Sequence, residues 1–388
     1  MGVETLTGSR CRSFAGPGGG TEHYISVEAH PGLGLAAQIA QVEARYADAR
    51  ESLGLAEDTA IFRRIFVSDA MNQAAVVRGS SLAASTAAGP VAISLVQQPP
   101  LPGAKIALLA YHVAGDDSVR KQRLSKHNLL VEKHGRRHLW TTGLCAGETR
   151  SDASPATQTR AIFGELIEAL ADEGASLRDN CLRTWLYLKD VDVFYQGMVD
   201  SRGAVFAEQG LTGDTHFIAS TGIEGACAHR YDLVAMDAYS NLDVDEAQVS
   251  YLNDFDRLCP TKDYNVHFER GSKVAYADRA HHFISGTASI DKYGEVVHLG
   301  DVLRQFDYAI DNVEALLRSG AAQLDDLMHL IVYLRDPSDH SAIARRLAER
   351  FPDLPTVIVQ GAVCRPQWLV EVEGVAIAAN DAPTLPPF

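Results

Sequence analysis

The sequence predicts an α/β (α+β) fold in which three tandem β-β-α-β-α-β-β units form an internal pseudo-trimer. Three segments carry this prediction, because each runs from a glycine through an acid-flanked turn into an apolar strand that ends at an aspartate: residues 54–69, 174–190 and 320–336. A helical pattern precedes each segment, over residues 35–53, 157–173 and 303–319. A mixed sheet with helices on one face needs a cover for its other face, and three units provide it by packing around an axis.

The other elements of each unit follow in the same order. A strand with a turn comes before each helix, and a second helix and two further strands come after each apolar strand. In the last of the three helices, Phe306, Ile310 and Val313 recur at helical spacing. A glycine follows each helix at the position expected for a C-cap. The upstream strands are predicted at residues 23–32, 137–147 and 281–294.

These patterns predict three units with polar connectors between them. The units are expected at residues 1–115, 125–245 and 265–388. The first connector contains the basic run RKQRLSKH at residues 120–127, which is interpreted as a solvated segment. The second connector covers residues 241–270.

The composition excludes several classes of function. The 388 residues carry a formal net charge of −15, which disfavours a nucleic-acid partner or an anionic membrane. No stretch approaches 18 consecutive apolar residues, so we expect a cytoplasmic protein without a membrane partner. The cysteines are scattered without a CxxC pair, which predicts reduced thiols and no metal site. They are Cys11, Cys145, Cys181, Cys227, Cys259 and Cys364.

The third unit resembles the YjgF/RidA family. It contains FISGTASID at residues 283–291, Gln305 and Asn312 on the following helix, VYLRD at residues 332–336 and LVEVEGVAIA at residues 369–378. Proteins of that family are homotrimers with ligand clefts between neighbouring subunits. The resemblance therefore implies that one chain with three units acts as a monomeric pseudo-trimer.

The second and third units together show a narrower resemblance, to the chorismatases. The matching segments are RTWLYLKDVD (183–192), IASTGIEG (218–225), VHFERGSKVAYADRAHHFISGTASID (266–291) and CRPQWLVEVEG (364–374). Chorismatases are RidA-like proteins that release pyruvate from chorismate and leave a dihydroxycyclohexadiene carboxylate or a hydroxybenzoate. The resemblance implies chorismate as the small-molecule substrate, and neither a metal nor an organic cofactor.

An acidic residue in the last strand distinguishes the third unit from the other two. Glu371 corresponds to Ala235 in the second unit and to Ala107 in the first, so the position is expected to be covered. Glu373, two residues further on the same strand face, has an acidic counterpart in Asp237 and is less distinctive. A covered carboxyl group that occurs in one unit alone is a candidate catalytic group.

The resemblance assigns Glu371 the part of the general acid. Protonation of the enolpyruvyl methylene carbon gives an oxocarbenium ion, which water or an internal oxygen can resolve, and this step needs an acid whose pKa is raised by burial. The resemblance also implies that Cys364 and Ala277 occupy positions that sort the products. Cysteine accompanies 3-hydroxybenzoate, whereas the hydroxybenzoate formers carry glycine at the position of Ala277. We favour 3-hydroxybenzoate, with 4-hydroxybenzoate and the diene diol as alternatives.

A substrate with two carboxylates needs cations and hydrogen-bond donors in its cleft. The candidates are basic side chains, hydroxyl groups and backbone N–H groups near the resembling segments, together with a tyrosine on the strand face of Arg183. They are Arg183, Tyr187, Ser220, Thr221, Gly222, Lys273, Arg279, Ser285, Gly286, Thr287 and Arg365.

Two other functions stay open at this stage. One is a RidA-type enamine/imine deaminase, but RidA deaminases carry an arginine two residues after the proline of the penultimate strand, where this chain has Val357. The other is a pseudo-trimer that binds a metabolite without converting it. Release of pyruvate from chorismate distinguishes the proposed enzyme from both.

Overall fold

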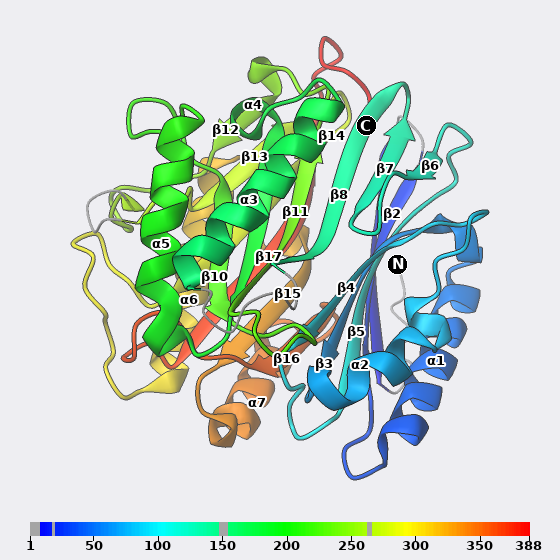
Figure 1. The fold of residues 1–388 in the computed structure, drawn as a ribbon, viewed down its shortest axis with the longest axis vertical. Helices are drawn as coiled ribbons and strands as arrows, with labels where there is room; N and C mark the ends of the chain where they lie inside the picture. Colours follow the sequence, from blue (N-terminus) through cyan, green and yellow to red (C-terminus); the bar gives the residue numbers. More distant parts are fainter. Residues whose placement is uncertain (1–7, 18–19, 147–153, 262–265) are drawn as a thin grey trace.

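Three β-sheets, each centred on one of the predicted units, surround a common core and carry their helices on the outer faces (Figure 1). The structure is a computed structural model that describes residues 8–17, 20–146, 154–261 and 266–388. The arrangement confirms the predicted α/β fold of three repeated units. None of the helices in the described ranges is both long and apolar enough to span a membrane.

The first sheet has the strand order β1-β2-β5-β3-β4. Helices α1 and α2 lie over its outer face in Figure 1, and their apolar side chains pack against it. The elements are β1 (Ser9–Ala15), β2 (Thr21–Glu28), α1 (Leu35–Ser52), β3 (Ala60–Val67), α2 (Ala70–Arg78), β4 (Ala92–Gln97) and β5 (Ile106–Ala114).

The second sheet has the order β10-β9-β11-β8-β7-β6, with α3 and α5 on its outer face. Its elements are β6 (Arg120–Arg123), β7 (Asn128–Lys133), β8 (Arg136–Cys145), α3 (Pro155–Asp172), α4 (Leu177–Asn180), β9 (Cys181–Leu188), α5 (Val191–Glu208), β10 (Ala219–Glu224) and β11 (Val234–Asn241).

The third sheet has the order β12-β13-β14-β17-β15-β16. Its elements are β12 (Val249–Tyr251), β13 (Gly271–Ala275), β14 (Arg279–Ala288), α6 (Val302–Ser319), β15 (Leu327–Leu334), α7 (His340–Arg350), β16 (Thr356–Gln360) and β17 (Val370–Ala379). Short 3-10 helices lie at Glu57–Thr59, Ser81–Ala83, Glu246–Gln248, Leu324–Asp326 and Pro337–Asp339.

Two short strands lie in the predicted connectors. The basic run forms β6, which pairs with β7 at the edge of the second sheet, and Lys121 Nζ donates to the Ala60 carbonyl oxygen of the first unit at 2.8 Å. This segment is therefore an edge strand rather than a solvated connector. In the second connector, β12 pairs with β13 and extends the third sheet.

The strand register relates the three units to one another. The last strand of each unit, β5, β11 or β17, pairs antiparallel with β3, β9 or β15, and each of these pairs parallel with β4, β10 or β16. Glu371 lies opposite Tyr333, Ala235 opposite Tyr187, and Ala107 opposite Phe66. These three pairs occupy equivalent positions, so the structure supports the comparison made between the sequence copies.

Aromatic rings from all three sheets pack at the centre. Trp140 of the second sheet stacks on Phe62 of the first at a ring distance of 5.0 Å and contacts Tyr111 at 5.8 Å. Tyr239 lies 4.8 Å from Trp140 and 5.2 Å from Phe283 of the third sheet. Because one apolar core includes side chains of every unit, the inner faces of the sheets cover one another.

Candidate active site

A cleft of about 230 Å³ lies between the second and third units. Its wall from the second unit is built by α5 and β10, and its wall from the third unit by β14, β17 and the segments that precede β13 and β17. The lining residues are Tyr195, Gln196, Arg202, Ser220, Thr221, Gly222, Val266, Phe268, Arg270, Gly286, Ala288, Ile290, Cys364, Arg365, Trp368 and Glu371.

Glu371 supplies the only acidic side chain among these lining residues. It lies on β17 with 5% of its surface exposed, and within the described residues its carboxyl group has no hydrogen-bond partner. Burial raises the pKa of Glu371 to about 8, and repulsion from Glu373 adds to the effect, while Arg183 and Arg270 oppose it. A carboxyl group with this pKa holds its proton at neutral pH.

A glycine makes room for this carboxyl group. A β-carbon added at Gly286 would lie 2.3 Å from Glu371 Oε1, so the carboxyl group would have to move. Gly286 lies in an irregularity of β14, where Ser285 and Gly286 together face Glu373 of β17. Such irregularities redirect side chains near active sites. The backbone of β14 thus approaches the Glu371 carboxyl closely because residue 286 has no side chain.

Glu373 has the opposite environment, although it shares a strand face with Glu371. Arg183 Nη2 donates to its carboxylate at 2.6 Å, Arg64 Nη1 at 3.4 Å and Trp185 Nε1 at 3.0 Å. The Thr221 hydroxyl also donates to it. Glu373 is 1% exposed, so these donors compensate its buried charge and hold it as a structural carboxylate.

Three arginines line the same cleft. Arg202 comes from α5 and donates through Nη1 to Ser220 Oγ at 3.4 Å. Arg270 precedes β13 and donates to the Cys259 carbonyl oxygen at 3.1 Å. Arg365 donates to the Gly294 carbonyl oxygen at 2.7 Å and lies over the Trp368 ring. With Glu371 protonated, the described lining residues include three cationic side chains and no anionic one, although the whole chain is acidic.

Cys364 lies in the cleft wall beside Tyr195. Burial raises the pKa of its thiol to about 12, and the nearby Glu371 raises it further, while a hydrogen bond with Tyr195 opposes the change. A thiol with this pKa stays protonated and is a weak nucleophile. Cys364 can therefore shape the cleft or donate a hydrogen bond, and it is not suited to covalent attack.

The structure brings seven of the predicted site residues to the cleft. They are Glu371, Cys364, Ser220, Thr221, Gly222, Gly286 and Arg365.

Two further predicted residues lie directly behind the wall of the cleft. Ser285 Oγ accepts from the Ser220 N–H at 2.9 Å and so links β14 to β10. The Thr287 hydroxyl donates to the Ser285 carbonyl oxygen at 2.9 Å, so it stabilises the irregular part of β14 instead of facing the cleft.

The remaining five predicted residues lie elsewhere, and their partners explain why. Arg183 binds Glu373, and the Tyr187 hydroxyl donates to Asp237 at 3.0 Å on the side of the first unit. Arg279 binds Glu22 at 2.7 Å and Asp278 at 2.9 Å. Lys273 faces neither wall of the cleft, because it lies on β13 between Ser250 and His282, and Ala277 lies in the turn after β13.

Sequence reasoning missed Arg202 and Arg270. Arg202 lies between Met198 and Phe206 on the buried face of α5, so a charged residue within the apolar stripe of a helix was the available signal. Arg270 lies inside a segment that resembles the chorismatases, VHFERGSK, but it was not distinguished from the neighbouring basic residues.

RidA deaminases carry an arginine at the position of Val357. In this cleft the equivalent position belongs to the wall from the second unit. Val357 is buried in the third unit and does not line the cleft. Its equivalent in the wall that faces Glu371 is Thr221. Val357 pairs with Ile331 and Thr221 pairs with Trp185, and these two partners occupy equivalent positions opposite Glu373 and Asp237. Because this residue is a threonine and not an arginine, the chain differs from the deaminase pattern at this position as well.

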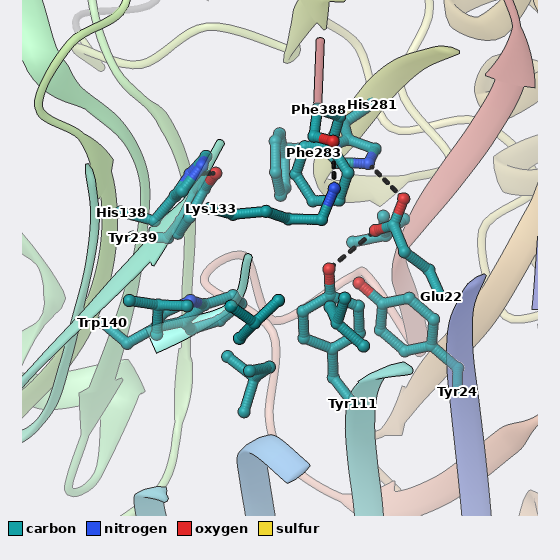
Figure 2. A pocket seen from close by; sticks show the side chains of 15 residues that line it. Glu22, Tyr24, Tyr111, Lys133, His138, Trp140, Tyr239, His281, Phe283 and Phe388 are labelled. Atoms are coloured by element: carbon teal, nitrogen blue, oxygen red, sulfur yellow. Dashed lines mark hydrogen bonds and ion pairs between the residues drawn. The ribbon is translucent and has the colours of Figure 1, made fainter. Parts of the chain in front are cut away.

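A second, smaller cavity lies at the centre of the molecule (Figure 2). Its volume is about 30 Å³, which is room for roughly one water molecule. Figure 2 shows Glu22 at one wall, where it accepts hydrogen bonds from Tyr111 at 2.7 Å and from His281 at 3.0 Å. Phe388 covers this cavity beside Lys133. It is too small for a metabolite, so the cleft between the second and third units is the candidate active site.

The third unit is similar to a family of known proteins. Residues 272–378 match the model of the family described as endoribonuclease L-PSP. The 3-aminoacrylate deaminase RutC of Acinetobacter baylyi is 30% identical over 96 residues, which cover 24% of this chain and 76% of that protein.

Two curated relatives extend the similarity beyond this unit. A 3-hydroxybenzoate synthase of Streptomyces hygroscopicus is 28% identical over 258 residues, which cover 60% of this chain and 73% of that protein. A chorismatase of Streptomyces rapamycinicus is 37% identical over 110 residues, 26% of this chain and 32% of that protein. A crystal structure of a chorismatase superposes with a TM-score of 0.62 over 96% of this chain and 99% of that chain, and at 17% identity it shows the shared fold.

Proposed function

Because the chain belongs to the endoribonuclease L-PSP (YjgF/RidA-like) family, we propose that it is a chorismatase, which converts chorismate to pyruvate and a hydroxybenzoate. The observation that carries the proposal is a buried carboxyl group with a raised pKa in a cleft lined by three arginines. The names of the two Streptomyces relatives support chorismate as the substrate.

The charge of the cleft fits a dianion. Chorismate carries one carboxylate on its ring and one on its enolpyruvyl group, and guanidinium groups bind carboxylates with two parallel hydrogen bonds. Arg202, Arg270 and Arg365 offer three such groups, and Ser220 and Thr221 add hydroxyl groups at the wall. A neutral Glu371 adds no negative charge, so the acid and a dianionic substrate can share the cleft.

The reaction begins with a proton transfer from Glu371. The carboxyl proton moves to the methylene carbon of the enolpyruvyl group, the carbon–carbon π bond supplies the electron pair, and an oxocarbenium ion forms at the ether carbon. The nearby arginines compensate the carboxylate that remains. In the hydrolytic route water adds to this carbon, the ether bond breaks, and pyruvate and a diene diol result.

In the other route no water enters the products. The neighbouring ring hydroxyl oxygen bonds to the ring carbon that carries the ether and releases its proton, while the bond from that carbon to the ether oxygen breaks and pyruvate leaves with this oxygen. The resulting epoxide opens at the carbon that first carried the hydroxyl group, its oxygen takes up a proton, and loss of the proton on the other carbon gives 3-hydroxybenzoate. Cys364 beside Glu371 favours this route in our proposal, with 3-hydroxybenzoate as the product. Phe268 and Trp368 provide an apolar wall that limits the access of water.

Incubation of the purified chain with chorismate tests the proposal. We expect pyruvate in a lactate dehydrogenase assay and one equivalent of 3-hydroxybenzoate by liquid chromatography. The variant Glu371→Gln keeps the shape of the side chain and removes the proton, so it should stay folded and lose turnover. A folded wild-type protein that releases no pyruvate would overturn the proposal.

An assay for ammonia release tests the alternative that the chain is a deaminase. A deaminase of 2-aminoacrylate releases ammonia, and a chorismatase does not. We expect no ammonia above the uncatalysed rate, because Thr221 stands where RidA deaminases carry arginine. Both walls of the cleft belong to one chain, so we propose that a single chain is sufficient for activity.

A further inference from the structure

Four side chains with metal-binding groups meet in the second unit, outside the cleft described above. Cys145 ends β8, and Cys227, His229 and Asp232 lie on the segment that joins β10 to β11. One ligand atom from each of the four lies within 4.8 Å of all the others. Thiolate, imidazole and carboxylate groups are the ligands that zinc uses in proteins.

The spacing of these atoms is close to that of a tetrahedral site. His229 Nδ1 lies 2.8 Å from Asp232 Oδ2 and 3.4 Å from Cys145 Sγ, and Cys227 Sγ lies 3.4 Å from Asp232 Oδ2. Around tetrahedral zinc, the nitrogen–oxygen edge is about 3.3 Å and the edges to sulfur are about 3.6 Å. These three distances differ from the tetrahedral edges by about half an ångström or less, and the other three are at most 4.8 Å.

The carboxyl group of Asp232 provides an independent observation. Its side chain is fully buried, and Oδ1 has no hydrogen-bond partner among the described residues. A buried carboxylate oxygen without a partner is destabilising. A cation bound beside it would compensate this oxygen and the two thiols together, whereas a disulfide would join the sulfur atoms and leave the carboxylate unchanged.

We propose that Cys145, Cys227, His229 and Asp232 bind one Zn²⁺ ion. The ion ties the end of β8 to the segment between β10 and β11. All four ligand positions come from protein side chains, which is typical of a structural zinc site rather than a catalytic one. The proposal differs from the expectation drawn from cysteine spacing, because the fold places two distant thiols together.

The proposed site lies at a position of the second unit that is equivalent to the candidate active site of the third. Cys145 pairs with Ala235 on β11, as Ala288 pairs with Glu371 on β17. The proposed ion therefore lies where the second unit corresponds to the catalytic region of the third. In this unit the equivalent edge is fixed by a metal instead of being open to a substrate.

Metal content of the untagged full-length chain tests this proposal without substrate. The protein is purified from cells grown with added zinc, dialysed against metal-free buffer and analysed by inductively coupled plasma mass spectrometry. We expect about one equivalent of zinc per chain. After removal of zinc by a chelator, added Co²⁺ should give the visible absorption bands of a tetrahedral site and a near-ultraviolet thiolate band.

Three variants separate the site from adventitious binding. Cys145→Ser and Asp232→Asn should lose the bound zinc and the cobalt bands, and Cys11→Ser in the first unit should keep both. Three outcomes would overturn the proposal: less than about a tenth of an equivalent of zinc in the wild type, equal binding by all variants, or a disulfide-linked peptide pair of Cys145 and Cys227 in the protein as isolated. Because no substrate is used, these outcomes are independent of the chorismatase proposal.

Discussion

The interface between the second and third units and its counterpart between the first and second units have equivalent strands and different chemistry. The first contains Glu371 on β17, and the second contains Ala235 at the equivalent position of β11. Glu373 and Asp237 occupy the next equivalent pair of positions, and both are buried and hydrogen-bonded. The two interfaces therefore differ by one acid, Glu371, which lies in front of a carboxylate that both interfaces use for structure.

The loss of that acid should have the largest effect. We expect Glu371→Gln to lower kcat by about 10²–10⁴-fold, because the proton donor is removed, with little change in the circular dichroism spectrum. The control in the second unit is Asp237→Asn, at the position equivalent to Glu373. It removes a buried acceptor of Ser94 and Tyr187, so it should lower stability while the folded fraction keeps its kcat. An equal loss of kcat in both variants would contradict the assignment of Glu371 as the acid and of Asp237 as a structural carboxylate.

Arg64 connects the two regions, and its replacement should have the next largest effect. Its guanidinium group lies 3.4 Å from both Asp237 and Glu373, and its side chain is 2% exposed. Arg64→Met leaves two buried carboxylates with fewer cations, so the free energy of unfolding should fall by about 3–5 kcal/mol. Urea denaturation measures the change, and a loss below about 1 kcal/mol would show that the network is dispensable.

Two glycines at equivalent positions, Gly286 and Gly143, test the same difference between the units. In Gly286→Ala the new methyl group displaces the Glu371 carboxyl, and a shift of about 1 Å lowers kcat by up to about 100-fold. Gly143 is the equivalent residue of the second unit, with open space around it and a φ of +65°. Gly143→Ala should therefore cost about 1 kcal/mol of stability through backbone strain, with kcat unchanged. Steady-state kinetics and thermal melts distinguish these outcomes.

The pKa of Glu371 predicts the basic limb of the pH profile. The reaction needs the protonated acid, so kcat/KM should fall about tenfold per pH unit above pH 8. The same shift lowers stability between pH 4.5 and about 8, since the unfolded chain releases a proton that the folded chain retains. The melting temperature of Glu371→Gln should thus exceed that of the wild type more at pH 9 than at pH 5. A wild-type profile that is flat to pH 10 would remove Glu371 as the acid.

Replacement of Cys364 should have the smallest effect on the rate and a measurable effect on the products. The thiol is protonated and lies in the cleft wall, so Cys364→Ala should change kcat by less than about tenfold. We expect the share of diene diol to rise relative to 3-hydroxybenzoate, because water gains room near the oxocarbenium ion. Chromatography of the two products measures the ratio, and an unchanged ratio would assign the choice of product to other residues.

The fold could be predicted because its signals are local. Each unit repeats its own helix and strand patterns, and the observed helices agree with the expected ranges within two residues at each end. Glu371 could be identified for a related reason, since the other two units supply alanine at its position. The three units of one chain could be compared with one another in the way that related sequences usually are.

The cations of the cleft could not be assigned in the same way, because their partners are distant in sequence. In the structure Arg183 binds Glu373, which is 190 positions away in the sequence. Arg279 binds Glu22, which is 257 positions away. These partners are too distant in the sequence for the pairing to be predicted. Arg202 and Arg270 line the cleft through packing between units. Charge and strand face predict where a side chain can point, but the partner that binds it depends on how the units are arranged.

Arg64 has a consequence for the history of the chain. Its equivalents in the second and third units are Trp185 and Ile331, and the residues opposite these three positions are Leu109, Asp237 and Glu373. Three copies of the first unit would bury three guanidinium groups against leucine, and three copies of the third would bury three carboxylates beside isoleucine. Pieces produced by cutting the gene at the connectors would therefore need one another, because identical copies of one unit would lack the opposite charges of this network.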